Sequence, residues 1–253
     1  RQKKRWEIPY KRGWKRWHYI TGLIFGVFLV WWSISGIFSM SRVPQWIVPT
    51  KAEFTFNTSR LWGKGVLPLE TYQLDYRKLQ DVYPDLKKVD WVRFADIPAY
   101  RIIEGENERY IDASGTEVVA LNVPQKTIEE GFRKIHGNDS KMTVTVLEKY
   151  DNYYLNLRRT LELPVYKVEF DDDDHNLYYV NPRDGYIRYL NKNKIVDKWL
   201  FSAIHYLNMG WLVNRPWLWT FCLWFLCIGC GIVCFTGVVL GVKTWLIRKK
   251  KKS

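Results

Sequence analysis

Two of the four histidines, His18 and His205, stand beside long apolar segments. An ionisable side chain at a membrane helix is a functional hypothesis by default, and an imidazole offers a nitrogen ligand to a metal. Gly22 and Gly26 follow His18 at intervals of four, so on a helix the ring stands above a groove without side chains. The alternative is an interfacial role, with both rings among the lipid headgroups. The residues alone leave both interpretations open.

The other two histidines have simpler explanations. His136 ends a predicted helix just before Gly137, where a cation stabilises the carboxyl end of the helix dipole. His175 closes the acidic run that starts at Asp171. Such a loop is usually solvated, although its carboxylates and imidazole could bind a divalent cation weakly. The spacing fits no EF-hand loop.

All four cysteines lie in the second apolar segment, and three of them, Cys227, Cys230 and Cys234, share one helical face. Small residues on one face allow another helix to approach closely. A thiolate metal site there would require deprotonation in an apolar medium, and no histidine or carboxylate stands nearby to assist it. We therefore interpret the stripe as a packing surface.

The two apolar segments run from Tyr19 to Met40 and from Trp217 to Val242, and neither contains a charged residue. At about 1.5 Å per helical residue, each is long enough to cross a hydrocarbon core of about 30 Å. The first is longer than a usual signal-peptide core, and no small-residue cleavage site follows it. Each contains a G-x-x-x-G motif, at Gly22 and at Gly237, which favours close packing against each other, a second chain or a flat ligand.

Nearly all of the net charge of +13 lies outside the region between the two segments, because 41–216 has equal numbers of basic and acidic residues. Basic flanks of membrane helices stay in the cytoplasm. We therefore expect both ends to be cytoplasmic and the central region to face the other side, which in a bacterium is the periplasm. The basic ends attract anionic lipid. Without a basic patch interleaved with aromatics in the central region, we expect no nucleic-acid binding.

The central region contains two similar segments 66 residues apart, starting at Pro98 and at Pro164. Each predicts a strand, an acidic turn, a second strand and a turn with glycine. Helical patterns at 73–82 and 127–136 precede them, each followed by a further strand, near 89–95 and 143–149. The pattern predicts one α+β domain in which a helix followed by an antiparallel sheet occurs twice.

The chain resembles the PepSY-associated transmembrane proteins over nearly its whole length. The resemblance rests on the order and spacing of four short elements: Trp17-His18-Tyr19-Ile20-Thr21-Gly22-Leu23, the paired strand units, Ile204-His205-Tyr206-Leu207 and Phe235-Thr236-Gly237. Larger relatives have four membrane helices, whereas this chain has two. The resemblance implies a membrane protein with two transmembrane helices and an extracytoplasmic α+β domain built from two PepSY-like repeats.

Family members that act as ferric-siderophore reductases carry histidines at these two positions, which ligate b-type haems at opposite membrane faces. The resemblance thus implies haem b, with His18 and His205 as iron ligands and with Gly22 and Gly26 leaving room for the porphyrin. Haem iron in low-spin electron transfer takes two axial nitrogens. One chain offers one histidine per face, so we expect a homodimer or a hetero-oligomer.

Two functions from different classes remain. The first is electron transfer across the bacterial inner membrane to a periplasmic acceptor, with a ferric siderophore as the implied substrate. The second is a cofactor-free accessory subunit whose outer domain binds a partner protein. No arrangement typical of hydrolases is present in the sequence. The predicted bounds are 1–17 and 248–253 for the basic cytoplasmic tails, 18–41 and 216–247 for the transmembrane helices, 42–196 for the periplasmic domain, and 197–210 for an interfacial amphipathic helix.

Overall fold

The computed structural model describes residues 10, 13–40, 43–157 and 160–250. The remaining positions, which include much of both basic tails, lie outside the described residues. The chain divides into two compact units. One comprises Pro44–Ile195; the other combines the residues up to Val43 with those from Val196 onward.

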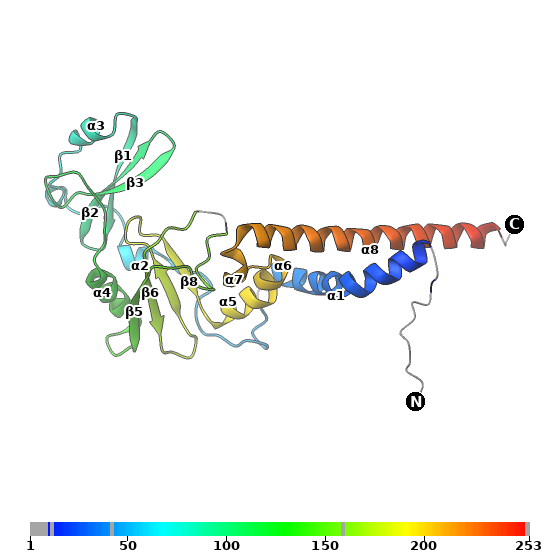
Figure 1. Ribbon diagram of the computed structural model, residues 1–253. Coiled ribbons are helices and arrows are strands. Elements are labelled where there is room, and N and C mark those ends of the chain that lie inside the picture. Colours follow the sequence, from blue (N-terminus) through cyan, green and yellow to red (C-terminus); the bar gives the residue numbers. More distant parts are fainter. Residues whose placement is uncertain (1–9, 11–12, 41–42, 158–159, 251–253) are drawn as a thin grey trace. The chain divides into compact units, whose positions relative to one another are not determined.

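Two long helices dominate the second of these units, α1 (Trp14–Met40) and α8 (Pro216–Lys250), which lie side by side (Figure 1). At about 1.5 Å per residue they are about 40 and about 52 Å long. Their most apolar windows are only 17% and 22% buried within the chain, unlike a core helix of a soluble protein. The prediction of two helices long and apolar enough to span a membrane is confirmed. Both extend beyond the predicted bounds, α1 at its start and α8 at its end.

The contact between α1 and α8 centres on Phe25, which is buried against Leu226 and Cys230. Its ring lies directly on Gly229, where a Cβ atom would overlap it. Phe225 adds an edge-on aromatic contact with a centroid distance of 5.2 Å. A residue without a side chain therefore allows the two helices to approach each other here.

The G-x-x-x-G motifs do not form this contact. Added Cβ atoms at Gly22, Gly26 and Gly241 would meet nothing within 4 Å, and Gly237 faces the ring of His18. The first motif, at Gly22, therefore does not pack the two helices against each other, whereas the second contacts α1 through Gly237 and His18. A second chain and a flat ligand remain as explanations for the other glycines.

The four cysteines of α8 differ in exposure. Cys230 is buried in the contact with α1, whereas the other three thiols are at least partly accessible.

The segment before α8 is a broken helix rather than the single amphipathic helix predicted for 197–210. It consists of α5 (Lys192–Asp197), the π-helical turn η2 (Lys198–Ser202) and α6 (Ala203–His205), after which the short helix α7 (Gly210–Val213) leads toward α8. The helix ends at His205 because Leu207 adopts a positive φ of 51°. Both η2 and α6 contact α1.

The unit Pro44–Ile195 contains two antiparallel four-stranded sheets whose strands follow in sequence order. The first has β1 (Leu86–Phe94), β2 (Ile97–Glu104), β3 (Asn107–Asp112) and β4 (Val119–Ala120); the second has β5 (Met142–Leu147), β6 (Val165–Phe170), β7 (Leu177–Val180) and β8 (Ile187–Leu190). Short helices α2 (Ser59–Trp62), η1 (Leu69–Thr71) and α3 (Lys78–Val82) precede the first sheet, and α4 (Gln125–His136) precedes the second.

The predicted hairpins are present as β2–β3 and β6–β7. Equivalent tyrosines occupy them, with Tyr100 opposite Ile111 and Tyr166 opposite Val180. The helix predicted for 73–82 is shorter, because the backbone N–H groups of Gln73 and Leu74 donate to the carbonyl of Ala113 and hold this stretch along the chain after β3.

A shared hydrophobic core joins the two sheets. Phe94 of the first sheet and Tyr178 of the second belong to it, together with Trp62 and Phe132 from the helices. The Trp62 indole donates to the carbonyl of Gly185 at 2.9 Å. That glycine has a φ of +69°, and a Cβ atom there would overlap the Phe94 ring. The halves therefore fold as one α+β unit.

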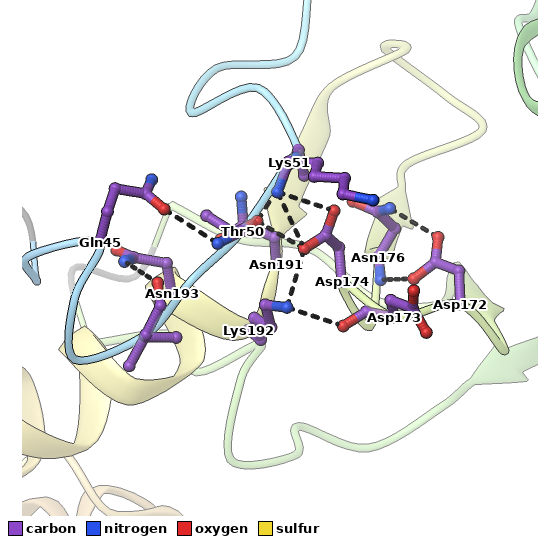
Figure 2. Close-up of polar contacts among 12 residues, drawn as sticks. Gln45, Thr50, Lys51, Asp172, Asp173, Asp174, Asn176, Asn191, Lys192 and Asn193 are labelled. Carbon is purple, nitrogen blue, oxygen red and sulfur yellow. Dashed lines mark hydrogen bonds and ion pairs between the residues drawn. The ribbon is translucent and has the colours of Figure 1, made fainter.

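Asp174, in the turn between β6 and β7, anchors the two ends of this unit (Figure 2). Its carboxylate accepts bonds from the Thr50 hydroxyl at 2.7 Å and the Lys51 backbone N–H at 3.2 Å, and it pairs with the Lys192 ammonium at 3.1 Å. Burial by itself would raise the pKa of Asp174, but these bonds outweigh it and lower the pKa below its ordinary value. The ionised form is thus the one that the fold requires.

We expect Asp174→Asn to lower the free energy of unfolding by about 1–3 kcal/mol at neutral pH, because the partly buried Lys192 ammonium loses its charged partner. Since folding lowers the Asp174 pKa, its stabilising contribution is present above the unfolded pKa of about 3.9 and is lost as pH falls through the folded pKa. Unfolding of the full chain in detergent, followed by near-ultraviolet circular dichroism, measures both effects.

Asp171→Asn is the matched control, because this carboxylate is exposed and lies 4.0 Å from Lys141. Equal stability losses in the two variants, or a loss for Asp174→Asn that persists below both pKa values, would contradict this role of Asp174.

Candidate functional site

His18 lies in the second turn of α1 and faces α8. Its Nδ1 atom is 2.9 Å from the hydroxyl of Thr236, and its ring rests on Gly237, where an added Cβ would be 3.4 Å from Cε1. Thr236 is only 3% exposed although it sits on an apolar helix. The imidazole is thus held by one defined polar contact and one residue without a side chain.

His205 is the last residue of α6 and faces α1. Its Nδ1 atom is 3.1 Å from the hydroxyl of Ser35, a side chain that is 2% exposed. Aromatic rings surround the imidazole, with Phe201 at a centroid distance of 5.0 Å and Trp32 at 6.2 Å. The Trp32 indole donates to the carbonyl of Ile204 at 3.3 Å, which joins α6 to α1 beside the histidine.

The two histidines therefore have the same local arrangement. Each imidazole is half-buried, each uses Nδ1 toward one buried hydroxyl, and the hydroxyl comes from a candidate membrane helix that does not carry the histidine. Among the residues that the structure describes, neither Nε2 atom has a hydrogen-bond partner. Each ring thus retains one nitrogen for a ligand.

An apolar recess of about 410 Å³ opens beside α6. Phe28 and Trp31 of α1 form one wall, and Trp199, Ala203 and Leu207 form the other. Its size falls within the range of small-molecule and cofactor sites, which are mostly apolar. The α6 side of the recess includes Ile204, the residue before His205, whereas the imidazole itself does not line it.

The two imidazoles lie at different levels along α1. The helix rises by about 26 Å between His18 and Ser35, the hydroxyl partner of His205, at about 1.5 Å per residue. This separation approaches the thickness of a hydrocarbon core of about 30 Å. Two redox groups at these levels would lie near opposite faces of a membrane.

The donor set suits a metal that brings most of its own ligands. Within the described residues there is no group of three or more His, Cys, Asp or Glu side chains able to hold a metal ion. Haem iron already has four porphyrin nitrogens and needs only axial ligands such as imidazole. His18 and His205 each offer one imidazole of this kind; Gly22 and Gly26 face open space on the helix that carries His18, and the apolar recess lies beside α6.

The other two histidines are not part of this arrangement. His136 contacts the Tyr178 hydroxyl at 3.0 Å and packs against the Phe170 ring in a tilted arrangement, with a centroid distance of 4.1 Å. His136 does end α4, as predicted, but burial lowers its pKa below the ordinary value, which favours the neutral ring over the expected cation. In the acidic run, His175 adopts a positive φ, and Asp172 and Asp174 bind protein groups rather than converging on a common centre (Figure 2).

The sequence pattern indicated both histidines and placed Thr236 in the Phe235-Thr236-Gly237 element, but it did not identify Thr236 or Ser35 as their partners. A signal was present, because both are polar residues within long apolar runs, and a polar group buried in apolar surroundings needs a partner. Which histidine each hydroxyl meets depends on how the helices pack.

Comparisons of the chain with models of protein families, with curated proteins and with solved structures found no match.

The α1–α8 contact beside these sites is sensitive to a single methyl group. We expect Gly229→Ala to lower the thermal stability of the full chain in detergent by the equivalent of about 1–3 kcal/mol, because the new Cβ overlaps the Phe25 ring. Gly231→Ala provides the control, since its Cβ would meet nothing within 4 Å. If both variants melt at the same temperature, the packing described for Phe25 is incorrect.

Proposed function

We propose that this chain is a haem-binding electron-transfer protein of the bacterial inner membrane, which passes electrons across the membrane to a periplasmic acceptor. One observation carries the proposal: two half-buried imidazoles at opposite levels of the α1–α8 pair, each held through Nδ1 by a buried hydroxyl. An interfacial histidine that only rests among headgroups would not need such a partner.

In this proposal His18 is the axial ligand near the cytoplasmic face and His205 the one near the periplasmic face. A bound b-type haem supplies the one-electron chemistry. The chain itself contributes the nitrogen ligands, excludes water with the apolar side chains around α6, and leaves the Gly22 and Gly26 faces open beside His18. Two haems held at these levels would lie about 26 Å apart along the axis of α1.

A second chain completes each site. One chain offers one histidine at each level, and a two-fold dimer supplies the second imidazole. The glycine faces that are not used within the chain, at Gly22, Gly26 and Gly241, give a second helix or a porphyrin room to approach. A hetero-oligomer in which another subunit contributes the second ligand fits the same geometry.

The acceptor is an iron complex of the ferric-siderophore class in this proposal, as the resemblance to PepSY-associated proteins implies. The unit Pro44–Ile195 offers a recess of about 480 Å³ between the first sheet and the β7–β8 turn. Trp62, Tyr110 and Tyr186 give it aromatic walls, and Arg101 and Asp184 line it with charge. A bulky complex with both aromatic and polar groups suits such a surface.

The second candidate is a cofactor-free accessory subunit. The observation that favours it is that the same two hydrogen bonds join separate helices: His18 connects α1 to α8, and His205 connects α6 to α1. Imidazole–hydroxyl bonds of this kind can act purely as packing contacts between membrane helices.

The colour of the purified protein separates the two candidates. From haem-replete cells we expect a reduced-minus-oxidised spectrum with b-type bands. His18→Ala is expected to remove one haem and spare the other, and His205→Ala to remove the second, because no adjacent side chain replaces an imidazole as a strong-field ligand. Pyridine haemochrome assay measures haem per chain.

His175→Ala serves as the control, since this histidine lies in the acidic turn of the unit Pro44–Ile195. Full haem content with an unchanged spectrum in both single variants would reject the ligand assignment. A colourless wild-type protein would reject the electron-transfer function and leave the accessory subunit.

The proposed orientation has its own test. The basic residues that flank both helices favour a cytoplasmic location for both ends. A reporter fused after Ser253 is expected to behave as cytoplasmic, and one inserted near Asn107 as periplasmic. Cleavage of the carboxyl-terminal tail by external protease in intact cells would contradict this orientation.

A further inference from the structure

We propose that Thr236 and Ser35 are positioning residues that hold His18 and His205 in one tautomer, with the proton on Nδ1 and the lone pair on Nε2. The importance of this tautomer for iron ligation rests on the proposed function. The tautomer itself is a property of the chain and can be measured without haem.

The geometry at Thr236 indicates the direction of its bond to His18. Its hydroxyl lies 2.8 Å from the carbonyl of Ile232 and 3.0 Å from that of Val233 on its own helix. A hydroxyl has one proton and two lone pairs. When the proton is donated back to the helix, the oxygen accepts a bond, and the Nδ1 atom at 2.9 Å must then carry the hydrogen.

Ser35 repeats this arrangement at the other level. Its hydroxyl is 3.1 Å from the carbonyl of Trp32, one turn earlier on α1, and 3.1 Å from Nδ1 of His205. Donation to Trp32 again leaves a lone pair for an Nδ1–H group. The two sites therefore reach the same tautomer with different hydroxyl residues on different helices.

The opposite tautomer is disfavoured at both sites. It would put the hydrogen on Nε2, which has no acceptor among the described residues, in surroundings made mostly of apolar helix. It would also require each hydroxyl to turn its proton from the helix carbonyl to the imidazole. The Nδ1–H tautomer thus pairs every N–H and O–H donor of these contacts and leaves only the Nε2 lone pair without a partner.

This tautomer leaves the Nε2 lone pair available as an axial ligand. A hydrogen bond from Nδ1–H fixes the ring orientation and makes the imidazole a more basic ligand, and loss of such a partner typically costs 10- to 100-fold in metal affinity. A more basic ligand stabilises ferric over ferrous iron. Removing either hydroxyl should therefore weaken haem binding at that level and raise the reduction potential of that haem.

The first experiment measures the tautomers directly. The full chain, labelled with ¹⁵N-histidine and prepared in detergent without haem, is studied by NMR at about pH 8, where ordinary imidazoles are neutral. Single His→Gln variants assign the signals. We expect Nδ1–H for His18 and His205, and we expect Thr236→Val to convert only His18 to a tautomer mixture.

The second experiment uses the haem-loaded protein. We expect Thr236→Val and Ser35→Ala each to lower haem affinity at one level by about 10- to 100-fold and to raise the potential of that haem. The conservative variants Thr236→Ser and Ser35→Thr keep a hydroxyl at each site, so they should retain the haem affinity and the reduction potential of the wild-type protein. Should Thr236→Val fail to fold, Thr236→Ala removes the same hydroxyl with less bulk.

Matched controls exist on the same helices. Thr244→Val on α8 and Ser33→Ala on α1 also remove a hydroxyl that bonds back to its own helix, at 2.8 and 2.9 Å, but both side chains are exposed and meet no histidine. These variants are expected to leave tautomers, affinity and potential unchanged.

The outcomes distinguish this inference from the proposed function. Nε2–H tautomers in the wild-type protein would overturn the inference, as would hydroxyl variants that match their controls in tautomer, affinity and potential. A colourless wild-type protein with Nδ1–H tautomers would reject the haem function while confirming the hydroxyl–imidazole arrangement.

Discussion

A buried polar group in an apolar helix pair must find its partner within the protein, and this constraint organises the sites around α1 and α8. Thr236 and Ser35 are almost completely buried, and each bonds both to its own helix and to a histidine from another helix. The hydroxyls thus determine where His18 and His205 lie. The connection through α6 also depends on this constraint, because its last residue is His205.

Phe25 packs on one glycine of the α1–α8 pair, and several other glycines of these helices make no close contact within the described residues. Phe25 fills the space over Gly229, which fixes the spacing of α1 and α8 at that level. With this contact satisfied by one aromatic ring, Gly22, Gly26 and Gly241 face open space. The single histidine at each level and the unused glycine faces are the two features that the proposed dimer would explain.

The unit Pro44–Ile195 is stabilised by a core that its two sheets share. A four-stranded sheet and a short helix bury little surface alone. Two copies of the same helix-and-meander pattern share one core, in which Trp62 bonds to Gly185 and Phe94 packs on it. Asp174 then binds both ends of the unit, at Thr50 and Lys192 (Figure 2). The hairpins were predictable from alternating apolar residues and glycine turns, whereas this carboxylate resembled an ordinary solvated acidic loop.

The two long helices, the paired hairpins and the two histidines of interest were predictable from the amino-acid order, because apolar length, strand alternation and nearness to an apolar segment are local properties. The packing of the folded chain was needed to learn which hydroxyl meets which histidine, why the helix ends at His205, and that Phe25 packs on Gly229 rather than on a glycine of a G-x-x-x-G motif. These features depend on packing between residues far apart in the chain, such as His18 and Thr236. Local patterns carry no information on that pairing, since the partner is selected by burial and by the requirement that every buried polar atom be satisfied.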